Sequence, residues 1–320
     1  MLQLEHKHEI TEALKQWLDD SNPARSGNKL AEKSGVSASY ISSIKNKKYE
    51  YEVNGKPFSI SDAHFYRLAE ALGIRFDGQL HWTFLDNFKR VQRACRKAQS
   101  KAIRMVIDGP TRMGKTFAQE DYAITNDYVV YVKCTQNMSS KDLLDEILAA
   151  LGVHDLIRGN HNKLKMIKSM ITRRKGYLII IDEVEVVKAG IYGVIKDISD
   201  WANGKAGFII TGMDLIKKLD NLARRGKPGF PQLKGRFFGN QVLTSMSLTQ
   251  SEIVAVCEHE GITNKSAQNV LAHEVENLDV LAQYVADIKE WQEKHGAKIK
   301  GEQLNDFLNL GIGQIGRRAA

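Results

Sequence analysis

The hydrophobic and polar positions divide the chain into a helical beginning, an alternating middle and a helical end. Over residues 1–84 the apolar positions recur at the spacing of α-helices. Residues 29–44 predict two short helices about a sharp turn at Gly35, and Asn54-Gly55 is typical of the turn of a small hairpin. A further helix is predicted over 63–72. We therefore expect the first part of the chain to form a small helical domain.

Strands alternate with helices in the middle region, and this alternation predicts a parallel sheet covered by helices. The expected strands are 103–107, 128–132, 177–181, 208–211 and 241–243. The run at 177–181 is apolar throughout, which is typical of a strand buried on both faces. The expected helices begin at Lys115, run from a cap at Ser139 to Leu151, and cover 163–174 and 191–202.

The last region returns to helical spacing from Thr249 onward. Helix starts are expected near Ser251, Asn264 and Asn277, whose side chains can cap a first turn. Residues 311–320 are expected to be disordered. These boundaries predict three domains, at residues 1–84, 85–246 and 247–320.

A phosphate-binding loop follows the first strand of the middle region. The motif G-x-x-x-x-G-K-[ST] is matched in full by Gly109, Pro110, Thr111, Arg112, Met113, Gly114, Lys115 and Thr116. Its glycines let backbone N–H groups wrap a phosphate at the positive end of the following helix. Lys115 is expected to reach the β- and γ-phosphates, and the Thr116 hydroxyl to ligate Mg²⁺. The loop therefore predicts that the chain binds ATP with Mg²⁺.

A pair of acids supplies the second half of a nucleotide site. The apolar strand near 178–181 ends in Asp182 and Glu183. Beside a phosphate loop, Asp182 can hold the water shell of Mg²⁺, and Glu183 can act as the general base for the attacking water. A strand that merely ends in two solvated acids is the alternative. The two motifs together predict Mg²⁺-dependent hydrolysis of ATP.

Charge points toward a polyanionic partner. The net charge is +8 and the sequence pI about 9.2, and three acid-poor basic clusters lie at 89–101, 158–175 and 217–236. A solvated helix face is the simpler explanation for any one of them. Three widely spaced cysteines fit packing in a reducing cytoplasm, and neither a membrane span nor a signal peptide is expected.

Residues 30–44 fit a helix-turn-helix that binds DNA. Gly35 permits the turn, and Ile41 and Ile44 would hold the second helix to the core. The residues expected to face DNA are Ser37, Ser39, Ser42, Ser43, Lys45, Asn46 and Lys47. Only Asn46 can make a bidentate base contact, so we expect weak sequence preference. A helical interaction module remains the alternative.

The two nucleotide motifs, their spacing and the helical end resemble the AAA+ ATPases. The domain order is more similar to the B protein of phage Mu and its relatives, ATPases that serve DNA transposition. The resemblance implies an α/β fold: a P-loop AAA+ core with a parallel sheet, an N-terminal helix-turn-helix domain and a C-terminal helical lid. It also implies a DNA-stimulated ATPase that oligomerises into a filament or ring on double-stranded target DNA. Such a protein delivers the DNA to a DDE-type transposase or activates that enzyme.

The resemblance assigns further roles by position. Thr211 would sense the γ-phosphate, and Arg236 would be the arginine finger that reaches a neighbouring subunit, with Arg224 and Arg225 as competitors. Asp279 stands where many relatives carry a lid arginine. Candidates for the DNA-lining wall are residues 137–141 and the basic helix that carries Lys163, Lys165, Arg173 and Arg174.

Two other functions stay open at this point. One is a replication initiator or helicase-loading ATPase, which would share the domains but act on other partners. The other is a regulatory ATPase that uses its helix-turn-helix at one operator.

Overall fold

The computed structural model describes the chain in two compact units. The described residues are 4–19, 26–34, 36–53, 56–60, 62–72, 74, 82–153, 156–227, 229–237, 239–296 and 298–304. The turns expected at Gly35 and Asn54-Gly55 and the tail 311–320 lie outside them. One unit comprises residues 1–79 with 121–127, and the other comprises 80–120 with 128–320.

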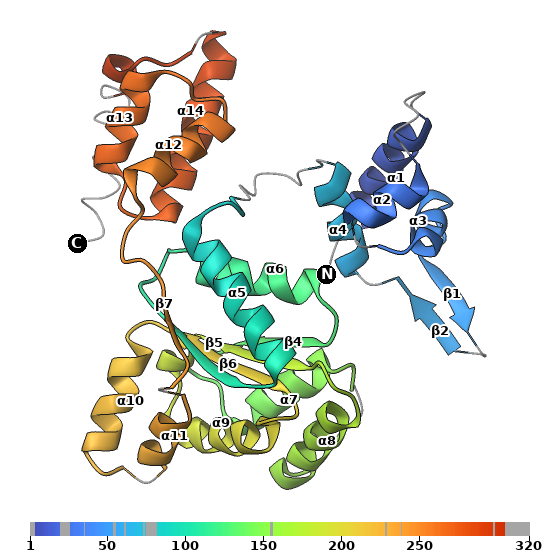
Figure 1. The fold of residues 1–320 in the computed structure, drawn as a ribbon, viewed down its shortest axis with the longest axis vertical. Helices are drawn as coiled ribbons and strands as arrows, with labels where there is room; N and C mark the ends of the chain where they lie inside the picture. The colour runs from blue at the N-terminus through green and yellow to red at the C-terminus, as the bar shows by residue number, and fades with distance from the viewer. Residues whose placement is uncertain are drawn as a thin grey trace. The chain divides into compact units, whose positions relative to one another are not determined.

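In its described residues, the N-terminal unit combines four helices with two paired strands (Figure 1). Its elements are α1 (Leu4–Asp19), α2 (Gly27–Ser34), α3 (Ala38–Lys45), β1 (Glu50–Val53), β2 (Lys56–Ser59) and α4 (Asp62–Leu72). The strands pair antiparallel. The helices bury Ile10, Leu14, Leu30 and Phe65 in one core, which also takes Ile41 of α3. Burial of this apolar stripe is what holds such short helices in place.

A five-stranded sheet, parallel throughout, forms the centre of the larger unit, as the alternating pattern predicted. Its strands are β3 (Arg104–Asp108), β4 (Val129–Lys133), β5 (Leu178–Asp182), β6 (Gly207–Gly212) and β7 (Gln241–Leu243). Their order across the sheet is β4-β5-β6-β3-β7. Every residue of β5 and β6 is buried, because both strands lie inside the sheet with helices on both faces.

Helices cover both faces of this sheet (Figure 1). On one face lie α5 (Asp86–Lys101) and α6 (Lys115–Thr125). On the other lie α7 (Ser140–Ala150), α8 (Asn160–Arg173), α9 (Ala189–Ala202), α10 (Leu215–Arg224) and α11 (Phe230–Phe237). Ser139 caps α7 in a reciprocal capping box with Asp142, at the position where the sequence predicts a cap.

In the described residues, the C-terminal part of the larger unit consists mainly of three helices, to which the segment before α5 is packed. The helices are α12 (Gln250–His259), α13 (Lys265–Glu274) and α14 (Leu278–His295). Asn264 and Asn277 cap α13 and α14 as expected, whereas α12 is capped by Thr249, two residues before the expected start. Trp82 and Leu85, which precede α5, pack into the core of these helices. Among the helices that the structure describes, none combines the length and the hydropathy that crossing a bilayer requires.

Candidate nucleotide-binding site

The phosphate loop joins β3 to α6, as its motif requires. Gly114 has φ +80°, and a Cβ there would lie 3.0 Å from Leu278 Cδ1. A Cβ at Gly109 would lie 1.8 Å from Thr244 Oγ1. Glycine is therefore needed at both positions, at Gly114 for its backbone conformation and at Gly109 for the close approach of the β7 strand end.

Lys115 is folded back onto the loop. Its Nζ donates to the carbonyl oxygens of Gly109 at 2.8 Å and Pro110 at 2.6 Å, and the residue is 8% exposed. Burial lowers the pKa of Lys115, an effect that the nearby carboxylates of Asp182 and Glu185 oppose. Contact with a phosphate therefore requires the ammonium group to leave these two carbonyls.

Side-chain hydroxyl groups from three neighbouring elements donate hydrogen bonds to Asp182. The carboxylate accepts hydrogen bonds from Thr116 Oγ1 at 2.7 Å, from Tyr131 at 3.1 Å and from the buried Thr211 hydroxyl. It also accepts the Glu183 backbone N–H at 2.9 Å, and it is 1% exposed. Mg²⁺ prefers oxygen ligands and takes only one or two from a protein when phosphates supply others. A buried carboxylate beside the Thr116 hydroxyl fits that requirement.

Thr211 was expected to face the γ-phosphate. The structure places its fully buried hydroxyl on Asp182, with Gln119 Oε1 at 3.2 Å as a second neighbour. The cavity in front of the phosphate loop is not lined by Thr211. Any effect of this residue on the phosphate would therefore pass through the position of Asp182.

Glu183 occupies an unusual backbone conformation at the end of β5. Its φ of 54° and ψ of 40° are left-handed, which costs about 1 kcal/mol for a residue with a Cβ. Its carboxylate forms an ion pair with Lys133 Nζ at 3.1 Å, and that bond raises the pKa of Lys133. Lys133 of β4 lies opposite Asp182 of β5 in the register of the two strands, so the strand pairing itself brings Lys133 to the site.

A cavity of about 420 Å³ opens in front of the loop. Its lining includes residues that the motifs did not indicate, namely Glu120, Lys133, Glu185 and Gly212. Glu120 follows Thr116 by one helical turn on α6, so the two side chains share a face of that helix. Tyr131 and Lys133 are two positions apart on β4, so they share a face of that strand. Helix and strand periodicity could therefore have indicated Glu120 and Lys133 as neighbours of the site. Burial raises the pKa of both Glu120 and Glu185.

A smaller apolar pocket of about 170 Å³ adjoins this cavity and shares Gly114, Phe117 and Asp279 with it. Its remaining lining is apolar and comprises Trp82, Leu85, Phe88, Met113, Leu278 and Ala282. The rings of Phe88 and Phe117 lie 5.7 Å apart. A pocket of this chemistry can hold a planar base while the phosphates lie on the loop.

The last helix contacts the phosphate loop directly. The backbone N–H of Leu278, at the start of α14, donates to the Arg112 carbonyl oxygen at 3.0 Å. The Asp279 carboxylate lies 3.6 Å from Arg112 Nε. Asp279, which stands at the position where the resemblance led us to look for a lid arginine, thus pairs with a residue of the loop itself.

Arg236 is paired within its own chain. Its guanidinium binds Asp200 on α9 through Nη2 at 2.8 Å and through Nε. Asp200 also has Arg104 at 3.8 Å and Lys196 at 3.7 Å. A role in a neighbouring subunit would require Arg236 to leave Asp200. Asp200 would then still have Arg104 and Lys196 beside it.

The two competing arginines lie at the end of α10 and are exposed. Arg224 forms an ion pair with Asp220 at 2.8 Å, although its side chain is 76% exposed. Such a pair is weak in water, so Arg224 could exchange partners more easily than Arg236.

Several residues in α3 or next to its ends, which were expected to face DNA, take part in local contacts. Ser37 caps the helix by accepting the Tyr40 N–H at 3.3 Å, and Asn46 Nδ2 donates to the Ser42 carbonyl oxygen at 2.9 Å. Lys45 pairs with Asp19 and Lys47 with Glu12, at 3.6 Å and 2.9 Å. These side chains are exposed or partly exposed, as are Ser39, Ser42 and Ser43. The contacts are of the weak kind that a ligand can replace.

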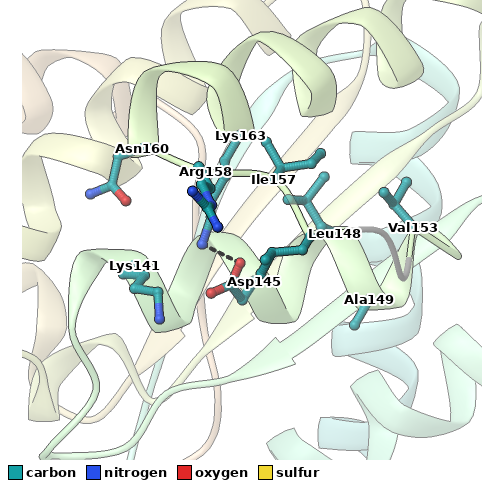
Figure 2. A pocket seen from close by; sticks show the side chains of 11 residues that line it. Lys141, Asp145, Leu148, Ala149, Val153, Ile157, Arg158, Asn160 and Lys163 are labelled. Atoms are coloured by element: carbon teal, nitrogen blue, oxygen red, sulfur yellow. Dashed lines mark hydrogen bonds and ion pairs between the residues drawn. The ribbon is translucent and has the colours of Figure 1, made fainter.

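The basic helix α8 buries Lys163 together with Ile167 and Ile171, whereas its other basic side chains are exposed. Lys163 is 3% exposed and donates to Asp145 of α7 across a pocket (Figure 2), so its expected place on a DNA-facing surface is wrong. An apolar residue would usually fill this inward position, and the ion pair with Asp145 is what allows a lysine there. Lys165, Arg173 and Arg174 are exposed, and the Arg174 guanidinium lies 4.1 Å from the centre of the Tyr128 ring.

Comparison with known proteins agrees with this fold. Residues 98–219 match the family model of the AAA domain. The match spans β3 to β6, including the phosphate loop and Asp182. The parallel sheet, the phosphate loop and the helices on both faces give the larger unit an α/β fold that matches a P-loop AAA+ core.

The solved structures to which the chain is similar include domain III of the replication initiation protein DnaA from Thermotoga maritima. It is 16% identical, over 72% of this chain and 98% of that one, with a TM-score of 0.49. The Holliday junction branch migration motor RuvB of Thermotoga maritima is 13% identical over 70% of this chain and 68% of that one, with a TM-score of 0.41. DnaA bound to AMPPCP and single-stranded DNA is 16% identical over 65% of this chain and 63% of that one, with a TM-score of 0.44. A search of curated proteins found no significant match.

Proposed function

We propose that the protein is a Mg²⁺-dependent ATPase that assembles on double-stranded DNA and delivers it to, or activates, a DDE-type transposase in the cytoplasm. One observation carries the ATPase part of this proposal. Thr116, Asp182 and Glu183 meet at one cavity with Lys115, in the arrangement that binding and cleaving a nucleoside triphosphate needs.

Each of these groups has a task in the proposed reaction. A bound Mg²⁺ would neutralise charge on the phosphates. Lys115 binds phosphate oxygens once it leaves the Gly109 and Pro110 carbonyls. The oxygen of a water forms a bond to the γ-phosphorus, and the bond from that phosphorus to the bridging oxygen breaks with its electron pair remaining on ADP. Glu183 takes one proton of the water, which requires its carboxylate to leave Lys133.

The DNA-binding part rests on charge. Exposed Lys165, Arg173 and Arg174 form a basic surface on the larger unit, and α3 offers a second set of polar and basic side chains. Contacts of this kind act mainly on phosphates, so binding would be weakly sequence-selective and sensitive to salt. The order of domains, which is similar to the phage Mu B protein, supports target DNA for transposition as the substrate and self-assembly on it.

A variant at the loop lysine tests the proposal. Lys115→Ala should lose ATP binding, measured by equilibrium titration with a fluorescent ATP analogue, and with it tight binding of plasmid DNA. Arg67→Ala, which changes a positive side chain in the N-terminal unit, is the charge-matched control. Unchanged affinity for ATP in Lys115→Ala would reject the nucleotide site.

Footprinting of the wild-type protein with ATP separates the DNA-related functions. Broad protection that extends with protein concentration supports assembly along target DNA. Protection of one short sequence would reject it in favour of an operator-binding regulator, and protection confined to a replication origin would favour an initiator.

A further inference from the structure

A third acid, Glu185, lies at the nucleotide cavity and has no role in the reaction described so far. It belongs to the short 3-10 turn η1 (Val184–Val186) that follows β5. The side chain lines the same cavity as Lys115 and Glu183. Its Oε2 atom is buried, and no described residue donates a hydrogen bond to it. A buried carboxylate oxygen without a donor is costly, so this position needs an explanation.

The surrounding structure reserves space for this carboxylate. A Cβ at Gly212, the last residue of β6, would lie 2.2 Å from Glu185 Oε2 and 3.0 Å from its Cδ. The backbone of the turn is held from α10, because Lys218 Nζ donates to the Glu185 carbonyl oxygen at 2.5 Å. Both the turn and the bare backbone of Gly212 therefore keep the carboxylate at the edge of the cavity.

Glu183 and Glu185 differ in their partners. The Glu183 side chain is 38% exposed and is paired with Lys133. The Glu185 carboxylate accepts hydrogen bonds from the backbone N–H groups of Glu185 and Met213. Its Oε2 atom, which faces Gly212, has no hydrogen-bond partner among the described residues, although Lys115 lines the same cavity. An acceptor oxygen of this kind beside a phosphate loop is suited to a ligand that can donate a hydrogen bond. A water molecule is such a donor.

We propose that Glu185 is a second catalytic carboxylate, which accepts a hydrogen bond from the attacking water while Glu183 removes the other proton. The inference rests on the proposed ATPase function. The water oxygen bonds to the γ-phosphorus, one proton passes to Glu183, and the hydrogen held by Glu185 stays on that oxygen in the phosphate product. Two acceptors fix the direction of the water's lone pair, which one acceptor leaves free to rotate.

The negative charge of Glu185 gives the test a readout besides turnover. A carboxylate near the γ-phosphate repels ATP more than ADP, because only ATP carries that group. Glu185→Gln keeps the shape and removes the charge. It should lower kcat by about tenfold or more and raise the ratio of ATP affinity to ADP affinity. Glu290→Gln, a substitution on the exposed surface of α14, is the matched control and should change neither.

A second variant displaces the carboxylate without altering it. Gly212→Ala places a methyl group against Oε2, the flexible end of the side chain, at a residue whose φ is not in the left-handed region. It should also lower kcat, with the ATP-to-ADP ratio closer to wild type because the charge remains. Circular dichroism melts show whether each variant is folded.

The measurements separate this inference from the proposed function. Wild-type kcat and a wild-type affinity ratio in folded Glu185→Gln, with turnover reduced in Glu183→Gln, would overturn the role of Glu185. Absence of turnover in the wild-type protein, with and without DNA, would instead reject the ATPase. The affinity ratio would then still decide whether Glu185 lies beside the γ-phosphate: a raised ratio supports that placement, and an unchanged one overturns it.

Discussion

Glu260 is a fully buried carboxylate at the end of α12, and its removal should destabilise the C-terminal helices by a predictable amount. Its Oε1 accepts the Trp82 indole N–H at 3.0 Å and lies 2.8 Å from His259 Nδ1. Lys289 of α14 donates to Oε2. The group thus joins the segment before α5, which lines the apolar pocket, to two helices of the C-terminal part.

The size of the effect follows from the pKa of Glu260. Burial alone would raise that pKa, but the hydrogen bonds from Lys289, Trp82 and His259 outweigh burial and hold it at about 2. The ordinary value is 4.5, so the folded state favours the charged form by about 3 kcal/mol. Because the folded pKa is depressed, this stabilisation is complete above pH 4.5 and is lost as the pH falls from about 4.5 to about 2.

The assay uses Glu260→Gln in a background where Trp17 and Trp201 are replaced by phenylalanine. The remaining tryptophans, Trp82 and Trp291, both belong to the C-terminal core. Urea unfolding followed by their fluorescence at pH 7 should show the free energy of unfolding of this part reduced by about 3 kcal/mol. The difference between Glu260→Gln and its parent should shrink steadily below pH 4.5.

Glu290→Gln, on the exposed face of α14, should leave the transition unchanged, since its pair with Lys294 lies in water. A Glu260→Gln transition that coincides with its parent at pH 7 would refute the reasoning. So would a difference between the two proteins that is the same at pH 7 and pH 3.

Three further outcomes are expected. Glu183→Gln should bind ATP, hydrolyse it slowly and give DNA complexes that dissociate more slowly in a filter-binding chase; wild-type dissociation would mean that hydrolysis does not drive release. Arg236→Ala should bind ATP normally and lose about 10³-fold or more in turnover, and mixing it with Lys115→Ala should restore partial activity. A mixture that stays inactive, although each variant assembles with wild type, would exclude Arg236 as the finger. Arg173→Ala and Arg174→Ala should each reduce the slope of log K against log salt by about 1, and an unchanged slope would remove α8 from the DNA contact.

The local parts of this protein could be predicted from its sequence. The phosphate loop needs its residues in one order, so the motif named Lys115 and Thr116 directly. Apolar runs marked β5 and the strands beside it, and cap residues marked the starts of α7, α13 and α14, because periodicity and capping depend on neighbours only a few positions away. The pair Asp182 and Glu183 was found in the same way, from its place at a strand end.

The partners of these residues were decided by tertiary structure. Placing β3 between β6 and β7 sets the phosphate loop beside Gly212 and Thr244, and no local pattern specifies that order. The same packing turned Lys163 inward to Asp145, although the local run of basic residues indicated an exposed face.

Long-range contacts also determined which hydrogen-bond partners the buried carboxylates have. Trp82 and Glu260 are separated by 178 positions, and Thr211 meets Asp182 only because β5 and β6 are adjacent. A motif records residue types that chemistry requires at fixed spacing along the chain. Hydrogen-bond partners and burial depend instead on which distant segments share the core, and those are settled only when the whole chain minimises exposed apolar surface and unpaired polar groups together.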